Sequence, residues 1–115
     1  MKNNIMKVEH KGHTTIIRNT QGKTNVFFQK IESEYHTYIS QNLILDLSYD
    51  KELTMDDVKL FIDLIKSHVK AKKSLVLVSN SVNFNIVPKT ITLVPTILEA
   101  HDIIEMEEIE RDLGF

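Results

Sequence analysis

Two short, almost uninterrupted apolar runs constrain the fold of this chain more than any other feature. They are NLILDL (42–47) and SLVLVS (74–79). Runs of this length and composition are typical of strands that are covered on both faces, as in parallel sheets flanked by helices. Between them lies a predicted helix over 55–70, whose apolar face comprises Val58, Phe61, Ile62, Ile65 and Val69. The succession of strand, helix and strand predicts an open α/β sheet with right-handed crossovers.

The amino-terminal third predicts a hairpin followed by a helix. Residues 4–11 alternate Met6, Val8 and His10 with charged side chains, as a half-buried strand does, and Gly12 marks a turn into a second strand over 13–19. The helix is predicted over 26–39, with Thr24 or Asn25 as its N-cap. Its apolar positions at helical spacing are Phe28, Ile31, Tyr35 and Ile39.

The carboxyl-terminal part predicts one more strand and one more helix. Residues 79–89 allow a turn or two of helix at most, and TITLVP (90–95) is predicted to be a buried strand. The last helix begins with the capping-box pattern from Thr96 to Glu99. It ends at Gly114, with Phe115 placed for a Schellman contact. The predicted order is β-β-α-β-α-β-(short turn)-β-α in a single domain over 1–115.

Length, charge and composition exclude several classes of protein. A chain of 115 residues buries one core, and a net charge of -2 gives no reason to expect nucleic acid or an anionic membrane as a partner. The absence of cysteine excludes disulfides, zinc–thiolate sites and thiol catalysis. No apolar run approaches the ~18 residues of a membrane span, and the first residues lack an apolar signal region, so a cytoplasmic location is expected.

The junction between the strand at 42–47 and the next helix is the most informative local motif. Thr54 is the predicted N-cap and Asp57 occupies the third helical position, where it can return the capping interaction. Asp56 and Asp57 also lie near the positive end of the helix dipole. Capping alone accounts for these residues, whatever the function.

The order of elements, together with LILDLS, the helix start at Thr54, SLVLVS and VPTILEA, resembles the STAS domain of anti-sigma-factor antagonists and sulfate transporters. The resemblance implies a mostly parallel sheet flanked by helices and, for an antagonist, a protein partner such as an anti-sigma factor. Antagonists carry Asp-Ser-Ser/Thr-Gly, with a phosphorylated serine, where this chain has Thr54, Met55, Asp56 and Asp57. The usual phosphoserine is therefore absent, and Asp56 supplies a fixed charge instead. Ser48 and Thr54 are the remaining hydroxyl groups near the junction.

The closing string EAHDIIEMEEIERDLGF is also similar to that of small Bacteroidota proteins often labelled ribonuclease Z. The true nuclease holds two zinc ions with a His-x-His-x-Asp-His cluster. No such cluster occurs here, and the chain is too short for that fold. The nuclease interpretation is therefore disfavoured.

No catalytic or cofactor motif is present in the sequence. The five histidines lack the spacing of metal ligands, and we interpret all five as solvent-exposed. Ser48 follows Asp46 at a strand end, but there is no G-x-S-x-G turn, no histidine placed as its base and no glycine-rich phosphate loop. We therefore expect neither an enzyme, nor a metal site, nor a cofactor.

Two surfaces carry more apolar side chains than folding requires. On the 55–70 helix, Leu60 and Leu64 lie away from the core face and, with Phe61, predict an apolar ridge beside the acidic helix start; alternatively, Leu64 only widens the core face. The predicted partner-binding residues are Ser48, Thr54, Met55, Asp56, Asp57, Leu60, Phe61 and Leu64.

The last helix also has two apolar faces. Ile97, Ala100 and Ile104 share one face, and the opposite face carries Met106, Ile109 and Leu113. Either the helix kinks near 103–105, or the second face is an interface with a basic partner or a homodimer. The alternative is a solvated acidic rim around a docked C-terminal helix.

These observations predict a non-catalytic, cytoplasmic protein-interaction module that resembles an anti-sigma-factor antagonist without its phosphoserine. The alternative is a small-molecule or anion-binding domain that uses the loop after Leu47 and the helix start at Thr54.

Overall fold

The computed structural model of the protein describes residues 6–82 and 84–114. Within these residues, five strands form one sheet: β1 (Met6–Lys11), β2 (Thr14–Asn19), β3 (Asn42–Asp46), β4 (Leu75–Val78) and β5 (Leu93–Val94). The helices are α1 (Thr24–Tyr38), α2 (Met55–Lys59), α3 (Ile62–Lys70) and α4 (Ile97–Asp112), with a short 3₁₀ turn η1 (Phe84–Ile86). The predicted order of elements is confirmed, except that one predicted helix is divided into α2 and α3.

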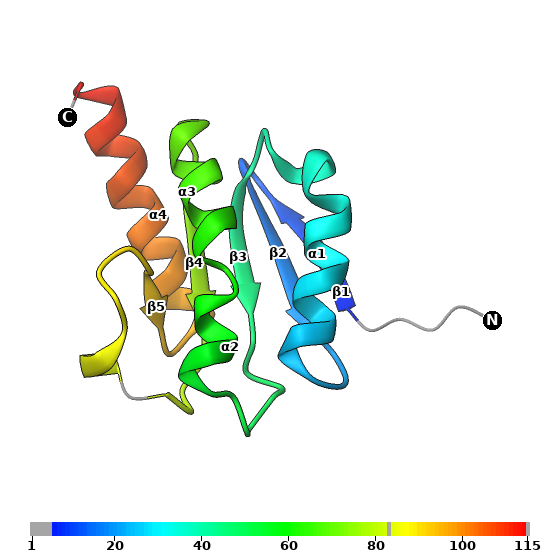
Figure 1. Cartoon of the computed structure of the whole chain (residues 1–115). Coiled ribbons are helices and arrows are strands. Elements are labelled where there is room, and N and C mark those ends of the chain that lie inside the picture. Colours follow the sequence, from blue (N-terminus) through cyan, green and yellow to red (C-terminus); the bar gives the residue numbers. More distant parts are fainter. Residues whose placement is uncertain (1–5, 83, 115) are drawn as a thin grey trace.

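The strands lie in the sheet in the order in which they occur in the chain, from β1 to β5. β1 pairs with β2 in antiparallel orientation, and every later pair is parallel. The predicted fold class, a mostly parallel α/β sheet that starts with a hairpin, is therefore confirmed. The carboxyl ends of β2, β3 and β4 lie at the lower edge of the sheet in Figure 1, where α2 begins.

Helices cover both faces of the sheet, which explains the apolar runs in β3 and β4. Leu43 and Leu45 belong to the core beneath α1, α2 and α3, whereas Ile44 belongs to the core beneath α4. Successive strand residues point to opposite faces, so a strand covered on both sides must be apolar throughout. Figure 1 shows α1, α2 and α3 together on one side of the sheet.

The two edge strands are less buried than predicted. Most side chains of β1 are exposed, including Val8 and His10, and only Met6 of the predicted apolar face packs against the core. Residues 4 and 5 lie outside the described residues. The strand predicted over 90–95 is reduced to two half-buried residues, and the buried apolar side chain there is Ile91.

Helix α1 begins earlier and faces the core differently than predicted. Its N-cap is Lys23, which makes no side-chain capping bond, so neither Thr24 nor Asn25 is the cap. The buried side chains are Thr24, Phe27, Ile31 and Tyr38, whereas Phe28 and Tyr35 are half-buried and Ile39 is exposed. The face of α1 that packs on the core is therefore centred on Phe27 rather than on Phe28.

The predicted 55–70 helix is interrupted at Leu60 and Phe61. Here the backbone bonds run three residues back, from Leu60 N–H to Asp57 O (3.3 Å) and from Phe61 N–H to Val58 O (3.2 Å). Such a turn rotates the chain by about 120° per residue instead of about 100°, which changes the face presented by α3. Leu64 is consequently 7% exposed and Phe61 0% exposed, whereas Val69 of the predicted core face is exposed. The alternative that Leu64 widens the core is confirmed, and the predicted ridge of Leu60, Phe61 and Leu64 is wrong.

Helix α4 is continuous from Ile97 to Asp112, so the kink proposed near 103–105 is wrong. Its N-cap is confirmed, because Thr96 Oγ1 accepts a bond from Glu99 N–H (3.1 Å). Gly114 follows the helix with φ of +82°, a conformation that favours glycine, while Phe115 lies outside the described residues.

Candidate functional site

The loop between β3 and α2 occupies the carboxyl edge of the parallel strands, where open α/β sheets place their binding sites. Two turns shape the loop after β3: Ser48 N–H donates to Asp46 Oδ1 (3.0 Å), and Asp50 N–H donates to Leu47 O (3.1 Å). The predicted capping box is present at its end. Asp57 N–H donates to Thr54 Oγ1 (3.2 Å), and Thr54 N–H donates to Asp57 Oδ2 (3.0 Å).

Asp50 ties this loop to the start of α1. One carboxylate oxygen accepts both the backbone N–H (3.0 Å) and the hydroxyl (2.8 Å) of Thr24, and the other accepts Glu52 N–H (3.0 Å). Asp50 therefore caps helix α1 from a distant part of the sequence, because Lys23 at the N-cap position makes no capping bond with its side chain. Desolvation by burial raises the pKa of Asp50, but the hydrogen bonds from Thr24 and Glu52 and the charge of Lys23 outweigh it, so its pKa lies below 3.8.

Replacing Asp50 by Ala should lower the free energy of unfolding by about 1–2 kcal/mol, because α1 loses its only described side-chain cap and Thr24 loses its acceptor. Because the folded pKa is lowered, this stabilisation is present above pH 3.8 and is lost as the pH falls below it. Urea unfolding at pH 7 and at pH 3 measures both effects. Glu52→Ala, in the same loop, is the control; equal losses in the two variants would contradict the capping role.

The exposed and half-buried side chains of this region define a small surface, which we call the α2 patch: Tyr49, Thr54, Met55, Asp56, Asp57 and Leu60. Tyr49 is 56% exposed and Leu60 is 38% exposed, while Met55 and Asp57 are half-buried. Ser48 is a half-buried residue of the loop, and Phe61 and Leu64 belong to the core. Of the eight predicted partner-binding residues, the structure thus removes Phe61 and Leu64 from the surface. Tyr49 was missed; its signal is an aromatic residue in an otherwise polar loop.

A shallow hollow of about 280 Å³ lies next to the capping box, lined by Lys23, Asn25, Asp50, Glu52, Thr54 and Asp57. Three carboxylates face one ammonium group there, a lining that disfavours an anion. The amide groups of Thr54 and Asp57 already bind the two side chains of the box. The geometry therefore gives no support to the anion-binding alternative.

The prediction that all five histidines are exposed is wrong for His68, and His101 is only half exposed. The His68 side chain is fully buried between α1 and the start of β3, where Tyr35 O–H donates to Nδ1 (2.7 Å) and Nε2–H donates to Gln41 O (2.6 Å). These two bonds fit a neutral imidazole protonated on Nε2. Burial lowers the pKa of His68 below 6.5, and the charges of Lys73 and Arg111 act in the same direction, against the hydrogen bond to Gln41. Across 6–82 and 84–114, no three His, Asp or Glu side chains are grouped as metal ligands.

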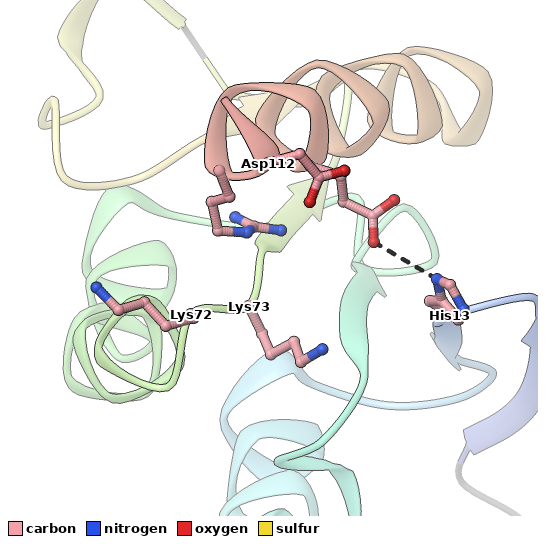
Figure 2. A pocket seen from close by; sticks show the side chains of 6 residues that line it. His13, Lys72, Lys73 and Asp112 are labelled. Atoms are coloured by element: carbon pink, nitrogen blue, oxygen red, sulfur yellow. Dashed lines mark ion pairs between the residues drawn. The ribbon is translucent and has the colours of Figure 1, made fainter. Parts of the chain in front are cut away.

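The opposite, amino edge of the sheet holds a second hollow, of about 350 Å³, lined by His13, Lys72, Lys73, Glu108, Arg111 and Asp112 (Figure 2). The charges here are of both signs, and Figure 2 marks the ion pair between His13 and Glu108 (3.8 Å). Arg111 donates to Ser74 Oγ (3.1 Å), and Asn42 Nδ2 donates to Glu108 Oε2 (2.8 Å). This network fastens α4 to Asn42, the first residue of β3, and to Ser74, which directly precedes β4, so we assign it a structural role.

The comparisons with known proteins show the fold. No family model matches the chain, and no curated protein matches it. Among solved structures, the chain is similar to the one described as "NMR Structure of the protein TM1081", with 15% identity and a TM-score of 0.59, covering 91% of this chain and 92% of that chain. At this identity the similarity shows the fold alone. Among the described residues, no helix has the length and apolar character needed to cross a membrane.

Proposed function

We propose that the protein is a non-catalytic, STAS-like interaction module of the cytoplasm that binds a regulatory protein through the α2 patch. In the STAS antagonists that the sequence resembles, the corresponding helix and the loop before it contact the partner. A partner of the anti-sigma-factor type fits this proposal. Because Met55 and Asp56 stand where antagonists have the serine, binding here does not depend on a phosphoserine switch.

The observation that carries the proposal is the exposure of Tyr49 and Leu60 on either side of a fully bonded capping box. Exposed aromatic and aliphatic side chains on a rigid support are typical anchors of protein interfaces. The support is rigid because the capping box and the Asp50 bonds to Thr24 fix the loop at both ends. The charge of Asp56 beside Leu60 favours a partner with a complementary cation.

The variant Leu60→Asp tests this proposal. Leu60 is 38% exposed, so the substitution should lower the free energy of unfolding by only about 1–2 kcal/mol and leave the protein folded. It places a charge where an apolar anchor is required, and we expect at least a tenfold loss of the captured partner. The measurement is affinity capture from the native cell lysate, with the bound proteins quantified by mass spectrometry.

Val69→Asp is the matched control, because Val69 is an exposed aliphatic residue on the neighbouring helix α3. A protein captured by wild type and by Val69→Asp, and lost with Leu60→Asp, would support the α2 patch and identify the partner. Equal capture by a folded Leu60→Asp variant would contradict the proposal.

A further inference from the structure

Helix α4 carries a row of exposed aliphatic side chains on the face turned away from the sheet. We call this row, Leu98, Met106, Ile109 and Leu113, the α4 outer stripe. Their side chains are between 58% and 73% exposed. At about 100° per residue, the four fall within a sector of about 80°. Met106, Ile109 and Leu113 follow one another along the last two turns of α4, and Leu98 lies about two turns earlier on the same face, with Asp102 between them. Three neighbouring exposed aliphatic side chains are more than scattered surface residues would produce.

The sheet-facing side of α4 is fixed, so the outer stripe cannot turn inward. Ala100 and Ile104 are buried against the sheet. Further along the helix, Ser74 Oγ donates to Glu107 Oε1 (2.5 Å), and Glu108 and Arg111 make the bonds to Asn42 and Ser74 described above. Rotating α4 to cover the stripe would break this polar network and expose the apolar core beneath Ala100 and Ile104.

The charged side chains that α4 itself places beside the stripe are almost all acidic, although Lys72 and Lys73 lie near its C-terminal end. Exposed carboxylates lie within it or along both of its sides: Glu99, Asp102, Glu105, Glu110 and Asp112. The helix has a single basic residue of the Lys or Arg type, Arg111, and this side chain is engaged on the sheet-facing side with Ser74. The acidic rim repels nucleic acid and anionic lipid. It also disfavours a second copy packed through the same face, because like charges would then meet.

We propose that the α4 outer stripe docks a basic amphipathic helix of a partner protein, with an aliphatic row flanked by Lys or Arg. Aliphatic side chains would pack along the stripe while the cations of the partner pair with its acidic rim. From Leu98 to Leu113 the stripe is about 22 Å long, which matches a partner helix of about four turns. This surface is separate from the α2 patch, and the proposal does not depend on the proposed function.

The probe is a fluorescently labelled synthetic peptide of 18 residues in which Leu repeats at helical spacing and Lys fills the remaining positions. Its binding to the full chain is measured by fluorescence anisotropy in about 0.15 M salt. We expect saturable binding to wild type and at least a tenfold weaker affinity for Ile109→Lys. Val26→Lys is the matched control, because Val26 is an exposed aliphatic residue on α1 and the change in charge is the same.

A scrambled peptide of identical composition separates helical docking from general attraction between charges. It should bind at least tenfold more weakly than the amphipathic peptide. Equal binding of the two peptides, or equal affinities of Ile109→Lys and Val26→Lys, would overturn the proposal. Sedimentation of the protein alone provides the last check: a concentration-dependent dimer that Ile109→Lys abolishes would assign the stripe to a second copy instead.

Discussion

Leu64→Asp should unfold the protein under conditions in which Leu60→Asp leaves it native. Leu64 is 7% exposed and belongs to the core beneath α1 and α3, whereas Leu60, four residues earlier, faces solvent. Removing a buried leucine side chain costs about 2–5 kcal/mol, and placing an unpaired carboxylate in the same apolar site adds to this loss. The total, about 4 kcal/mol or more, is comparable with the whole stability of a small domain.

Urea unfolding, followed by circular dichroism, compares Leu64→Asp, Leu64→Ala and Leu60→Asp with wild type. The expected order of stability is wild type, then Leu60→Asp with a small loss, then Leu64→Ala, then Leu64→Asp. A Leu64→Asp variant as stable as a folded Leu60→Asp variant would show that both leucines are on the surface, as a straight 55–70 helix would place them. Because the two positions differ in burial, Leu64 is unsuitable as a probe of partner binding.

His68→Ala should lower the free energy of unfolding at pH 7 by about 2–4 kcal/mol. The substitution leaves a cavity, removes the bond to Tyr35 and leaves the carbonyl of Gln41 without its donor. His68→Phe keeps most of the side-chain volume and should lower the free energy of unfolding less, by about 1–3 kcal/mol. This loss comes chiefly from the carbonyl of Gln41, which is left without a donor. His36→Ala, on the exposed side of α1, is the control and should have almost no effect.

His68 should also make the free energy of unfolding depend on pH. The pKa of His68 is lowered in the folded state, so below pH 6.5 the unfolded chain takes up a proton that the folded protein does not bind. Stability should therefore fall as the pH decreases from 6.5, by up to about 1.4 kcal/mol per pH unit from this group, until the pH passes the lowered pKa of the folded state. His68→Phe removes this contribution. Identical pH profiles for wild type and His68→Phe would contradict a buried neutral imidazole.

Apolar patterning and capping residues predicted the order of the elements, because the apolar runs and the box at Thr54 are local in sequence. The pattern failed where tertiary contacts decide. A constant 3.6-residue period assumes a straight helix, which would bury Val69 and place Leu64 away from the core. The tighter turn at Leu60 and Phe61 rotates α3, so Leu64 is buried and Val69 is exposed. The cap that Asp50 gives to Thr24 and the burial of His68 join segments 26 and 27 residues apart. The exposed face of α4 was predicted correctly for Met106, Ile109 and Leu113, since it follows from the helix alone.

The strands lie in the sheet in the same order as in the chain, and this order has a consequence for folding during synthesis. Each strand from β2 to β5 pairs with the strand before it, so no strand has to wait for a later one in order to enter the sheet. Each parallel pairing still has to close a loop that contains a helix, as between Thr14 and Asn42 or Leu43 and Leu75, but the sheet can grow strand by strand from the hairpin. Helix α4 follows all five strands in the sequence, and it contacts β3, β4 and β5. Until α4 is synthesised, the apolar face of the sheet that carries Ile44 and Val76 lacks the helix that covers it in the folded protein.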